Sequence, residues 1–109
     1  MRALGLAAIL TLCCVAPGAT QRPPKPVIHT VTIDAASFSP ASLTIRPGDT
    51  VHWVNKDLIP HTATAAGTGG FDSGSIAPGK WWRHTFKTKG TLPYVCTFHP
   101  TMKGKLEIR

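Results

Sequence analysis

The sequence has 109 residues and a formal charge of +7, from 12 lysines and arginines against 5 aspartates and glutamates. This length excludes a protein of several domains, because it suffices for one hydrophobic core of ordinary size. The basic residues are scattered rather than clustered, which argues against a nucleic acid as partner.

Residues 1–19 are predicted to be a secretory signal peptide. The chain begins with a positive charge, residues 3–15 are almost wholly apolar, and small residues follow as far as Ala19. Because a membrane span needs about 20 apolar residues, we expect cleavage near Ala19 and export without stable membrane insertion. An alternative is a lipoprotein acylated at Cys13 or Cys14, although the residues before them are not the small ones that such sites prefer.

The rest of the chain is predicted to be a Pro-rich linker at residues 20–26 followed by one domain at residues 27–109. Short runs in this domain alternate between apolar and polar residues, as a half-buried strand does. Trp82, His84 and Phe86, for example, fall on one face of their run. The expected strands cover residues 27–33, 42–46, 50–55, 80–86, 91–96 and 105–109, with loops at residues 38–41, 56–60 and 65–70.

Turn signals separate these strands, and no convincing amphipathic helix lies between them. Pro47-Gly48-Asp49 and Ala77-Pro78-Gly79 combine a proline that presets its backbone angle with a glycine that tolerates positive φ. With 10 glycines and 10 prolines in all, the pattern favours an all-β sandwich or barrel.

Cleavage would leave Cys96 as the one cysteine of the domain. In an oxidising compartment, a retained single cysteine is an inert buried residue, a nucleophile, an intermolecular bridge or a metal ligand. The neighbours of Cys96 favour a metal ligand, because His99 and Met102 follow at spacings of three residues and their loop could fold around one ion. His61, directly after a proline in an earlier loop, is the candidate for a further ligand.

Two histidines, a cysteine and a weak axial methionine form the donor set of a blue-copper electron-transfer site. Zinc is the main chemical competitor for such a set, but the thioether favours copper. Three other histidines, His29, His52 and His84, lie within strand patterns and are expected to have no ligand role. The predicted ligands of one copper ion are His61, Cys96, His99 and Met102.

Motifs along nearly the whole domain occur in an order that is typical of one protein family. The early strands read Phe38-x-Pro40 and Gly48-Asp49-Thr50-Val51-x-Trp53-x-Asn55. The first-ligand loop reads Asp57-x-x-Pro60-His61-Thr62, and the closing segment reads Tyr94-x-Cys96-x-x-His99-Pro100-x-Met102-x-Gly104. With Phe71-Asp72-Ser73-Gly74 between them, the chain resembles the cupredoxins of the plastocyanin and amicyanin type. The short spacing of its closing ligands is similar to that of amicyanins.

This resemblance implies a Greek-key β-sandwich and a type 1 copper protein that carries single electrons by cycling between Cu(II) and Cu(I). It implies that His99 reaches the surface as the exit for the electron. A donor and an acceptor protein would be the partners, and the positive charge of the chain suits an acidic docking surface. We expect a monomer in the periplasm. The residues expected to form an apolar docking patch around His99 are Leu58, Ile59, Pro60, Phe98 and Pro100.

An enzyme is not expected, because a fully ligated copper ion has no open position for a substrate. A periplasmic copper chaperone or storage protein with the same site is the alternative. Such proteins release their metal and often carry several methionines, whereas Met102 is the one methionine beyond Met1. The carrier is therefore preferred.

Two residues depart from the pattern of the family. Thr62 stands where many relatives have an asparagine that braces the closing ligand loop, which puts the bracing geometry in question. Phe98 stands where close relatives often have a proline, and its backbone N–H could bond to the Cys96 sulfur and tune the metal centre.

Overall fold

The computed structural model describes residues 3, 5, 7–9, 11 and 24–109, and among them it contains strands but no helix. Most of the predicted signal peptide and of the predicted linker lies outside these residues. Nothing in the described part forms a helix long and apolar enough to cross a membrane. The strands are β1 (Ile28–Asp34), β2 (Ser37–Ser39), β3 (Ser42–Ile45), β4 (Thr50–Asn55), β5 (Thr64–Ala65), β6 (Trp81–Thr85), β7 (Gly90–Cys96) and β8 (His99–Ile108).

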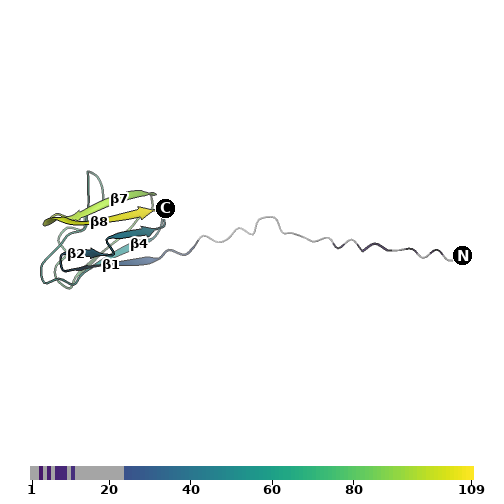
Figure 1. Cartoon of the computed structure of the whole chain (residues 1–109), viewed down its shortest axis with the longest axis horizontal. Helices are drawn as coiled ribbons and strands as arrows, with labels where there is room; N and C mark the ends of the chain where they lie inside the picture. Colours follow the sequence, from purple (N-terminus) through teal and green to yellow (C-terminus); the bar gives the residue numbers. More distant parts are fainter. Residues whose placement is uncertain (1–2, 4, 6, 10, 12–23) are drawn as a thin grey trace.

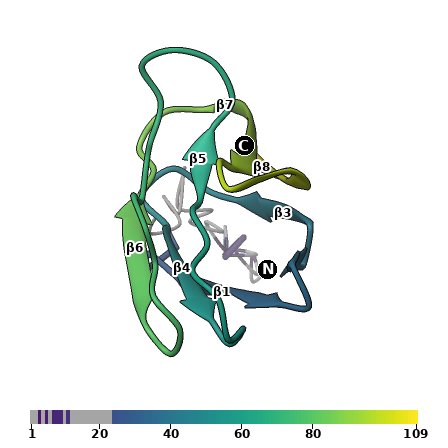
Figure 2. The ribbon, with the colours of Figure 1, turned by 90° about the vertical axis from the view of Figure 1, so that its left-hand side faces the viewer.

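The strands form two four-stranded sheets that face each other as a sandwich (Figure 1). The first sheet has the order β2-β1-β4-β6 and the second β3-β8-β7-β5. Both are mixed, because β1 pairs with β4 and β3 with β8 in parallel, while the other pairs are antiparallel. This arrangement confirms the predicted all-β Greek-key sandwich. Figure 2 views it from the end opposite the start of β1.

The core lies between the sheets and follows from the alternation of residues along each strand. In β4 the side chains of Val51, Trp53 and Asn55 are fully buried, while those between them are only partly covered. Trp53 is the centre of the core, with ring centroids 5.4 Å from Phe71 and 5.6 Å from Tyr94. Burial of each large apolar side chain contributes about 1.5–3 kcal/mol. The period-two pattern in the sequence therefore predicts correctly which face of β4 is buried.

The chain also forms strands where the sequence predicts none. β2 lies where a loop was expected, β5 has only two residues, and β8 begins at His99 instead of near residue 105. The turn between β1 and β2 has positive φ at both Ala35 (49°) and Ala36 (52°). Such a turn usually contains Asn-Gly, because alanine there costs roughly 1–2 kcal/mol per residue. Ala-Ala thus has no turn signal, and tertiary contacts must stabilise it.

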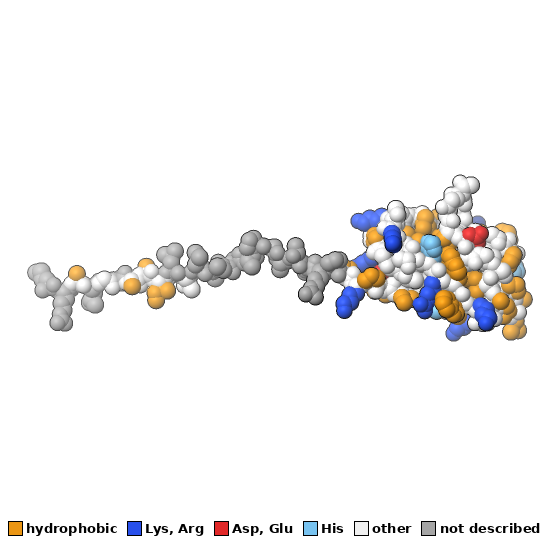
Figure 3. All heavy atoms as spheres, turned by 180° about the vertical axis from the view of Figure 1, so that it is seen from behind, with side chains coloured by type: hydrophobic (Ala, Val, Ile, Leu, Met, Phe, Trp, Pro, Cys, Tyr) orange, Lys and Arg blue, Asp and Glu red, His pale blue; other side chains and the backbone are white. Residues whose placement is uncertain are grey.

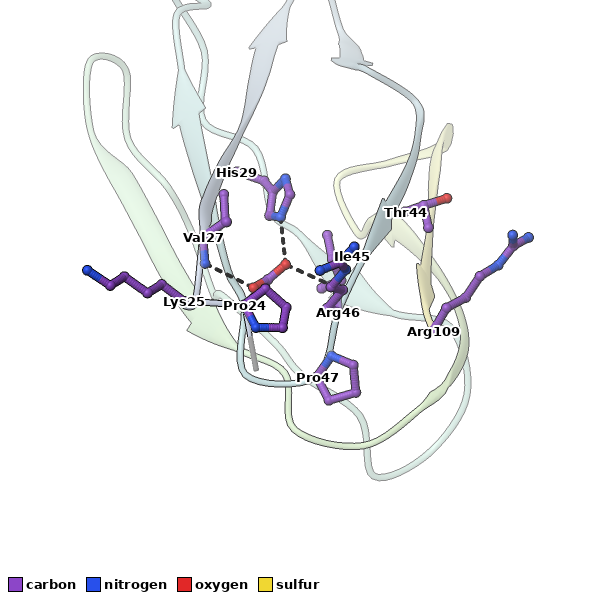
Figure 4. A pocket seen from close by; sticks show the side chains of 10 residues that line it. Pro24, Lys25, Val27, His29, Thr44, Ile45, Arg46, Pro47 and Arg109 are labelled. Atoms are coloured by element: carbon purple, nitrogen blue, oxygen red, sulfur yellow. Dashed lines mark hydrogen bonds and ion pairs between the residues drawn. The ribbon is translucent and has the colours of Figure 1, made fainter. Parts of the chain in front are cut away.

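At the end of the sandwich where β1 begins, the Asp49 side chain joins three segments. It accepts hydrogen bonds from the backbone N–H groups of Val27 (2.9 Å) and Arg46 (3.0 Å), and it lies 2.9 Å from Nε2 of His29. Figure 4 shows these interactions beside a cavity of about 460 Å³. Asp49 is buried and thereby fixes the start of β1 against the predicted turn at residues 47–49.

Asp49 gives the fold a predictable response to acid. Burial alone would raise its pKa, but hydrogen bonds from His29, Val27 and Arg46 outweigh burial and lower the pKa of Asp49 to about 2. Because this pKa lies below the unfolded value of about 3.9, the carboxylate stabilises the fold above pH 4 and loses that effect as the pH falls toward 2.

We therefore expect Asp49→Asn to lower the unfolding free energy at neutral pH by roughly 1–2 kcal/mol. The dependence of the unfolding free energy on pH between 2 and 4 should also become shallower. Urea unfolding of both proteins across this range measures the difference. Parallel curves for the two proteins would show that Asp49 has no part in acid unfolding.

Candidate metal centre

The loop after β4 is shaped by the buried side chain of Asn55. Its Nδ2 donates hydrogen bonds to the carbonyls of Ile59 and Ile76, both at 2.9 Å, and its Oδ1 accepts one from the N–H of Asp57 at 2.9 Å. The chain therefore turns back toward the core directly after the strand. His61 then forms an isolated β-bridge with Ile76 and is fully buried.

The closing segment is a tight hairpin rather than the open loop that the sequence suggests. β7 ends at Cys96, residues 97 and 98 form the turn, and β8 begins at His99. Cys96 and His99 are direct partners across the two strands, after a register irregularity at Val95 and Cys96. The hairpin thus places two of the predicted ligands side by side at the end of the sandwich remote from Asp49.

Three of the four predicted ligands converge. The Sγ atom of Cys96 lies 3.7 Å from Nδ1 of His61 and 3.8 Å from Nδ1 of His99, and all three atoms lie within 4.8 Å of one another. Cys96 is fully buried, while His99 is partly exposed. Met102 is buried in the same apolar cluster as Cys96. Among the histidines, cysteines and acidic residues that the structure describes, His61, Cys96 and His99 are the one group of three able to hold a metal.

These spacings fit a metal ion in the plane of the three atoms. Metal–nitrogen and metal–sulfur bonds of about 2.0 and about 2.3 Å, at an angle of about 120°, place nitrogen and sulfur about 3.7 Å apart. The thiolate, imidazole and thioether donors are those that copper prefers. The donor set and its geometry therefore fit a copper ion.

The second nitrogen of His61 has a partner that the sequence analysis did not find. Nε2 of His61 lies 2.8 Å from Oδ2 of Asp57, whose carboxylate also accepts the N–H groups of Ala35 (2.7 Å) and Ala36 (2.8 Å). A carboxylate can only accept a hydrogen bond, so Nε2 carries the ring proton and donates to it, and Nδ1 keeps a lone pair on the side of Cys96. Asp57 thus joins the strained turn between β1 and β2 to His61.

The pKa of Asp57 reflects these contacts. The hydrogen bond from the N–H of Ala36 lowers it, burial opposes this change, and hydrogen bonds from His61 and Ala35 lower it further. The net effect is a pKa below the usual range of an aspartate. Asp57 is therefore an anion at neutral pH, able to accept all three hydrogen bonds at once.

Thr62 braces the closing hairpin through its hydroxyl group, despite the absence of an asparagine. Its Oγ1 accepts the backbone N–H of Thr97 at 2.8 Å and lies 3.1 Å from Oγ1 of Thr97. Oγ1 of Thr64 lies 2.9 Å from Oγ1 of Thr62 and 3.0 Å from Oδ1 of Asp72. These contacts form a row of three hydroxyl groups between the hairpin and the Asp72 carboxylate.

The charge of Asp72 gives this row a direction. One hydroxyl carries one proton, and a carboxylate is the strongest acceptor in the row, so Thr64 donates to Asp72. The lone pairs of Thr62 then accept the backbone N–H of Thr97. The bracing geometry that the sequence put in question is thus supplied by threonines.

The hydrogen bond expected at the Cys96 sulfur has a different donor. The backbone N–H of Thr62 lies 3.3 Å from Sγ, whereas within residues 24–109 no such bond joins Phe98 to the sulfur. The expectation for Phe98 was therefore wrong. The sulfur instead faces the segment that carries His61 and Thr62.

The other histidines have partners of their own. His29 bonds to Asp49, His52 packs edge-on against Trp81, and His84 stacks on Trp82 with ring centroids 5.4 Å apart. None belongs to the group of candidate metal ligands found in the described residues.

Large apolar side chains surround this end of the domain. Leu58 is 95% exposed, Phe98 50% and Ile59 46%. Figure 3 shows hydrophobic side chains at this end of the domain as well as elsewhere on the face in view. Exposure of several such side chains around a half-buried histidine marks a surface suited to contact with another protein.

Comparison with known proteins agrees with this geometry. Residues 26–109 match the family described as copper binding proteins, plastocyanin/azurin family. The amicyanin of Paracoccus versutus is 31% identical over 80 residues, which are 70% of this chain but only 61% of that protein. Amicyanin-alpha of Methylorubrum extorquens is 31% identical over 119 residues, covering 99% of both chains.

The fold has the same relatives. The structure of a Cu(I) amicyanin in which a methionine is replaced by alanine superposes with a TM-score of 0.70 at 29% sequence identity. The match covers 75% of this chain and 82% of that one. The predicted cofactor, copper, and the predicted resemblance are thus both confirmed, and the chain belongs to the plastocyanin/azurin family of copper-binding proteins, with amicyanins among its relatives.

Proposed function

We propose that this protein is an exported electron carrier with one type 1 copper ion, held by His61, Cys96, His99 and Met102. The observation that carries the proposal is the convergence of Cys96 Sγ with two imidazole Nδ1 atoms at 3.7 and 3.8 Å. When bound, a copper ion in such a site takes up and gives back one electron. Cys96 would hold the ion as a thiolate, and the buried thioether of Met102 would be a weaker ligand.

The protein around the ligands keeps them in place. Asp57 orients His61, the N–H of Thr62 donates to the Cys96 sulfur, and the hydroxyl of Thr62 braces the hairpin. Ligands held in this way move little when an electron arrives or leaves. His99 is the least buried ligand and lies at the apolar end of the domain, so it is the exit for the electron. A copper ion held by all four side chains would have no open position for a substrate, which supports a carrier rather than an enzyme.

Location and partners complete the proposal. The signal-peptide pattern of residues 1–19 supports export to the periplasm. The protein would be a monomer. Its partners would be a donor and an acceptor protein that dock briefly at the apolar patch around His99. Weak redox complexes bury little surface, and a small patch of this kind is sufficient.

The test is the visible spectrum of the mature protein with one equivalent of Cu(II). We expect an intense blue colour that ascorbate bleaches and hexacyanoferrate(III) restores over repeated cycles. The Cys96→Ala variant should give no blue colour with Cu(II). The His84→Gln variant, which changes a histidine outside the candidate ligands, should stay blue. A colourless wild-type protein that binds Cu(I) instead would overturn the carrier and favour the copper chaperone or storage alternative.

A further inference from the structure

The outer face of the first sheet carries a group of aromatic and cationic side chains that the copper site does not use. Register across β4 and β6 pairs Val54 with Trp81 and His52 with Arg83. The indole of Trp81 is 57% exposed and Arg83 is also exposed. A tryptophan this exposed on an open sheet face is unusual, and tryptophan and arginine are the residues most enriched at the centres of protein interfaces.

Contacts among these side chains hold them in one arrangement. The guanidinium carbon of Arg83 lies 4.8 Å from the Trp81 ring centroid, within the range of a cation–π interaction. The His52 ring meets the Trp81 ring edge-on, with centroids 4.9 Å apart and an angle of 90° between the planes. An arrangement already ordered before binding loses less conformational entropy when a partner arrives.

The charge of this face is positive. Burial, followed by the positive charge of Arg83, lowers the pKa of His52, so His52 is neutral near pH 7. Lys56 follows β4 and Lys80 precedes β6, and the N–H of Asn55 donates to the carbonyl of Lys80 at 2.9 Å, which places these exposed lysines at one end of the same pair of strands. Within the described residues, no ion pair occupies Arg83, Lys56 or Lys80.

The acidic side chains nearby, Asp34 and Asp57, accept hydrogen bonds from other groups. Asp57 accepts hydrogen bonds from Ala35, Ala36 and His61, and Asp34 accepts one from the N–H of Ala35 at 2.9 Å. Both carboxylates keep their negative charge, so Arg83, Lys56 and Lys80 leave this part of the surface with a small net positive charge. Charge complementarity of this kind steers an oppositely charged protein toward the surface and sets its orientation.

We propose that this aromatic–cationic face, formed by His52, Trp81 and Arg83 with Lys56 and Lys80 at its end, is a docking site for an acidic partner protein. The face adjoins the apolar end of the domain, because Lys56 is two residues from the exposed Leu58. A partner on this face also reaches the apolar patch around His99. The part of the inference that makes this partner a redox protein rests on the proposed function.

The experiment uses the full copper-loaded protein, reduced to Cu(I), and poly-L-glutamate as the acidic probe. A titration at low ionic strength is followed by ¹H–¹⁵N NMR, in which each of the three tryptophans gives its own indole N–H signal. We expect the Trp81 indole and the Arg83 amide to shift most, while the indole of the buried Trp53 changes little.

Matched variants separate a specific face from net charge. Arg83→Gln should weaken the binding of poly-L-glutamate by about two- to fivefold, the size expected for one exposed ion pair. Lys89→Gln removes the same charge directly before β7, beyond the end of β6 that is remote from Lys80, and should weaken binding much less. Arg83→Lys keeps the charge but loses the planar stacking group, so an intermediate affinity is expected.

Equal weakening by Arg83→Gln and Lys89→Gln, or shifts spread evenly over the lysines, would overturn the docking site. These results do not depend on colour. A protein that is blue but binds poly-L-glutamate without preference for Trp81 refutes only the docking site. A colourless protein that does show this preference refutes only the electron carrier.

Discussion

Replacing Gly104 with alanine should destabilise the domain by at least about 2 kcal/mol, toward the upper part of the range for overpacked cores. Gly104 pairs with Tyr94 across β7 and β8. An added Cβ would lie 2.7 Å from Cε1 of the Tyr94 ring, and closer still to Cζ. Tyr94 is only 1% exposed and cannot swing into solvent. Its ring is already confined by Phe38 and Trp53, with centroids 4.7 and 5.6 Å away.

The added Cβ would displace the Tyr94 ring, and this displacement should also disturb the metal centre, because Tyr94 lies two residues before Cys96 on β7. Chemical unfolding measures the loss of stability, and the blue colour reports on the hairpin. Tyr94→Leu in the Gly104→Ala background removes the clashing ring, so a double-mutant cycle should give a favourable coupling energy. Lys103→Ala, exposed on the adjacent position, should stay within about 0.5 kcal/mol of wild type. Additive effects of the two core substitutions would refute the steric explanation.

Replacing Asp57 with asparagine should lower the copper affinity by about 10- to 100-fold, the usual cost of losing the partner of a metal-binding histidine. The two carboxylate oxygens accept three N–H groups. An asparagine has one carbonyl oxygen, so its NH₂ group must face either the N–H of Ala35 or the donors at His61 and Ala36. At least one of the three hydrogen bonds is then lost, and in the second orientation the one to His61 is lost.

Competition with a chelator measures the affinity, and ¹⁵N NMR of the metal-free variant measures which ring nitrogen of His61 carries the proton. We expect the fraction with the proton on Nε2 to fall in Asp57→Asn. Ala36→Gly is the control, since it keeps the backbone N–H and suits the positive φ of 52° at this position. An unchanged affinity and an unchanged proton position in Asp57→Asn would show that His61 is oriented by packing alone.

Much of the fold could be predicted because its signal is local. Val51 and Trp53 alternate with less buried residues, and the turn at residues 47–49 contains a proline and a glycine where the backbone needs them. Strand position and facing therefore follow from neighbouring residues. The strands that escaped prediction lack this signal. β5 is too short to show alternation, and β2 follows an Ala-Ala turn whose positive φ values nothing in the sequence announces.

The candidate site divides in a similar way. The donor types and the spacing of Cys96, His99 and Met102 are sequence properties, and their chemistry alone indicates copper. The groups that position them are not. Thr62 and Thr97 lie 35 residues apart, and Ala36 and Asp57 lie 21 apart, yet each pair is joined by a hydrogen bond of 2.8 Å.

The sequence alone thus determined the class of fold, the kind of metal and the candidate ligands, because residue type and short-range periodicity are sufficient for each. The tertiary structure decided that Cys96 and His99 face each other across a hairpin, that Thr62 supplies the N–H for the sulfur, and that Asp57 orients His61. These contacts arise where separate segments meet at one end of the sandwich. Their geometry depends on how the two sheets pack, which no local pattern in the chain records.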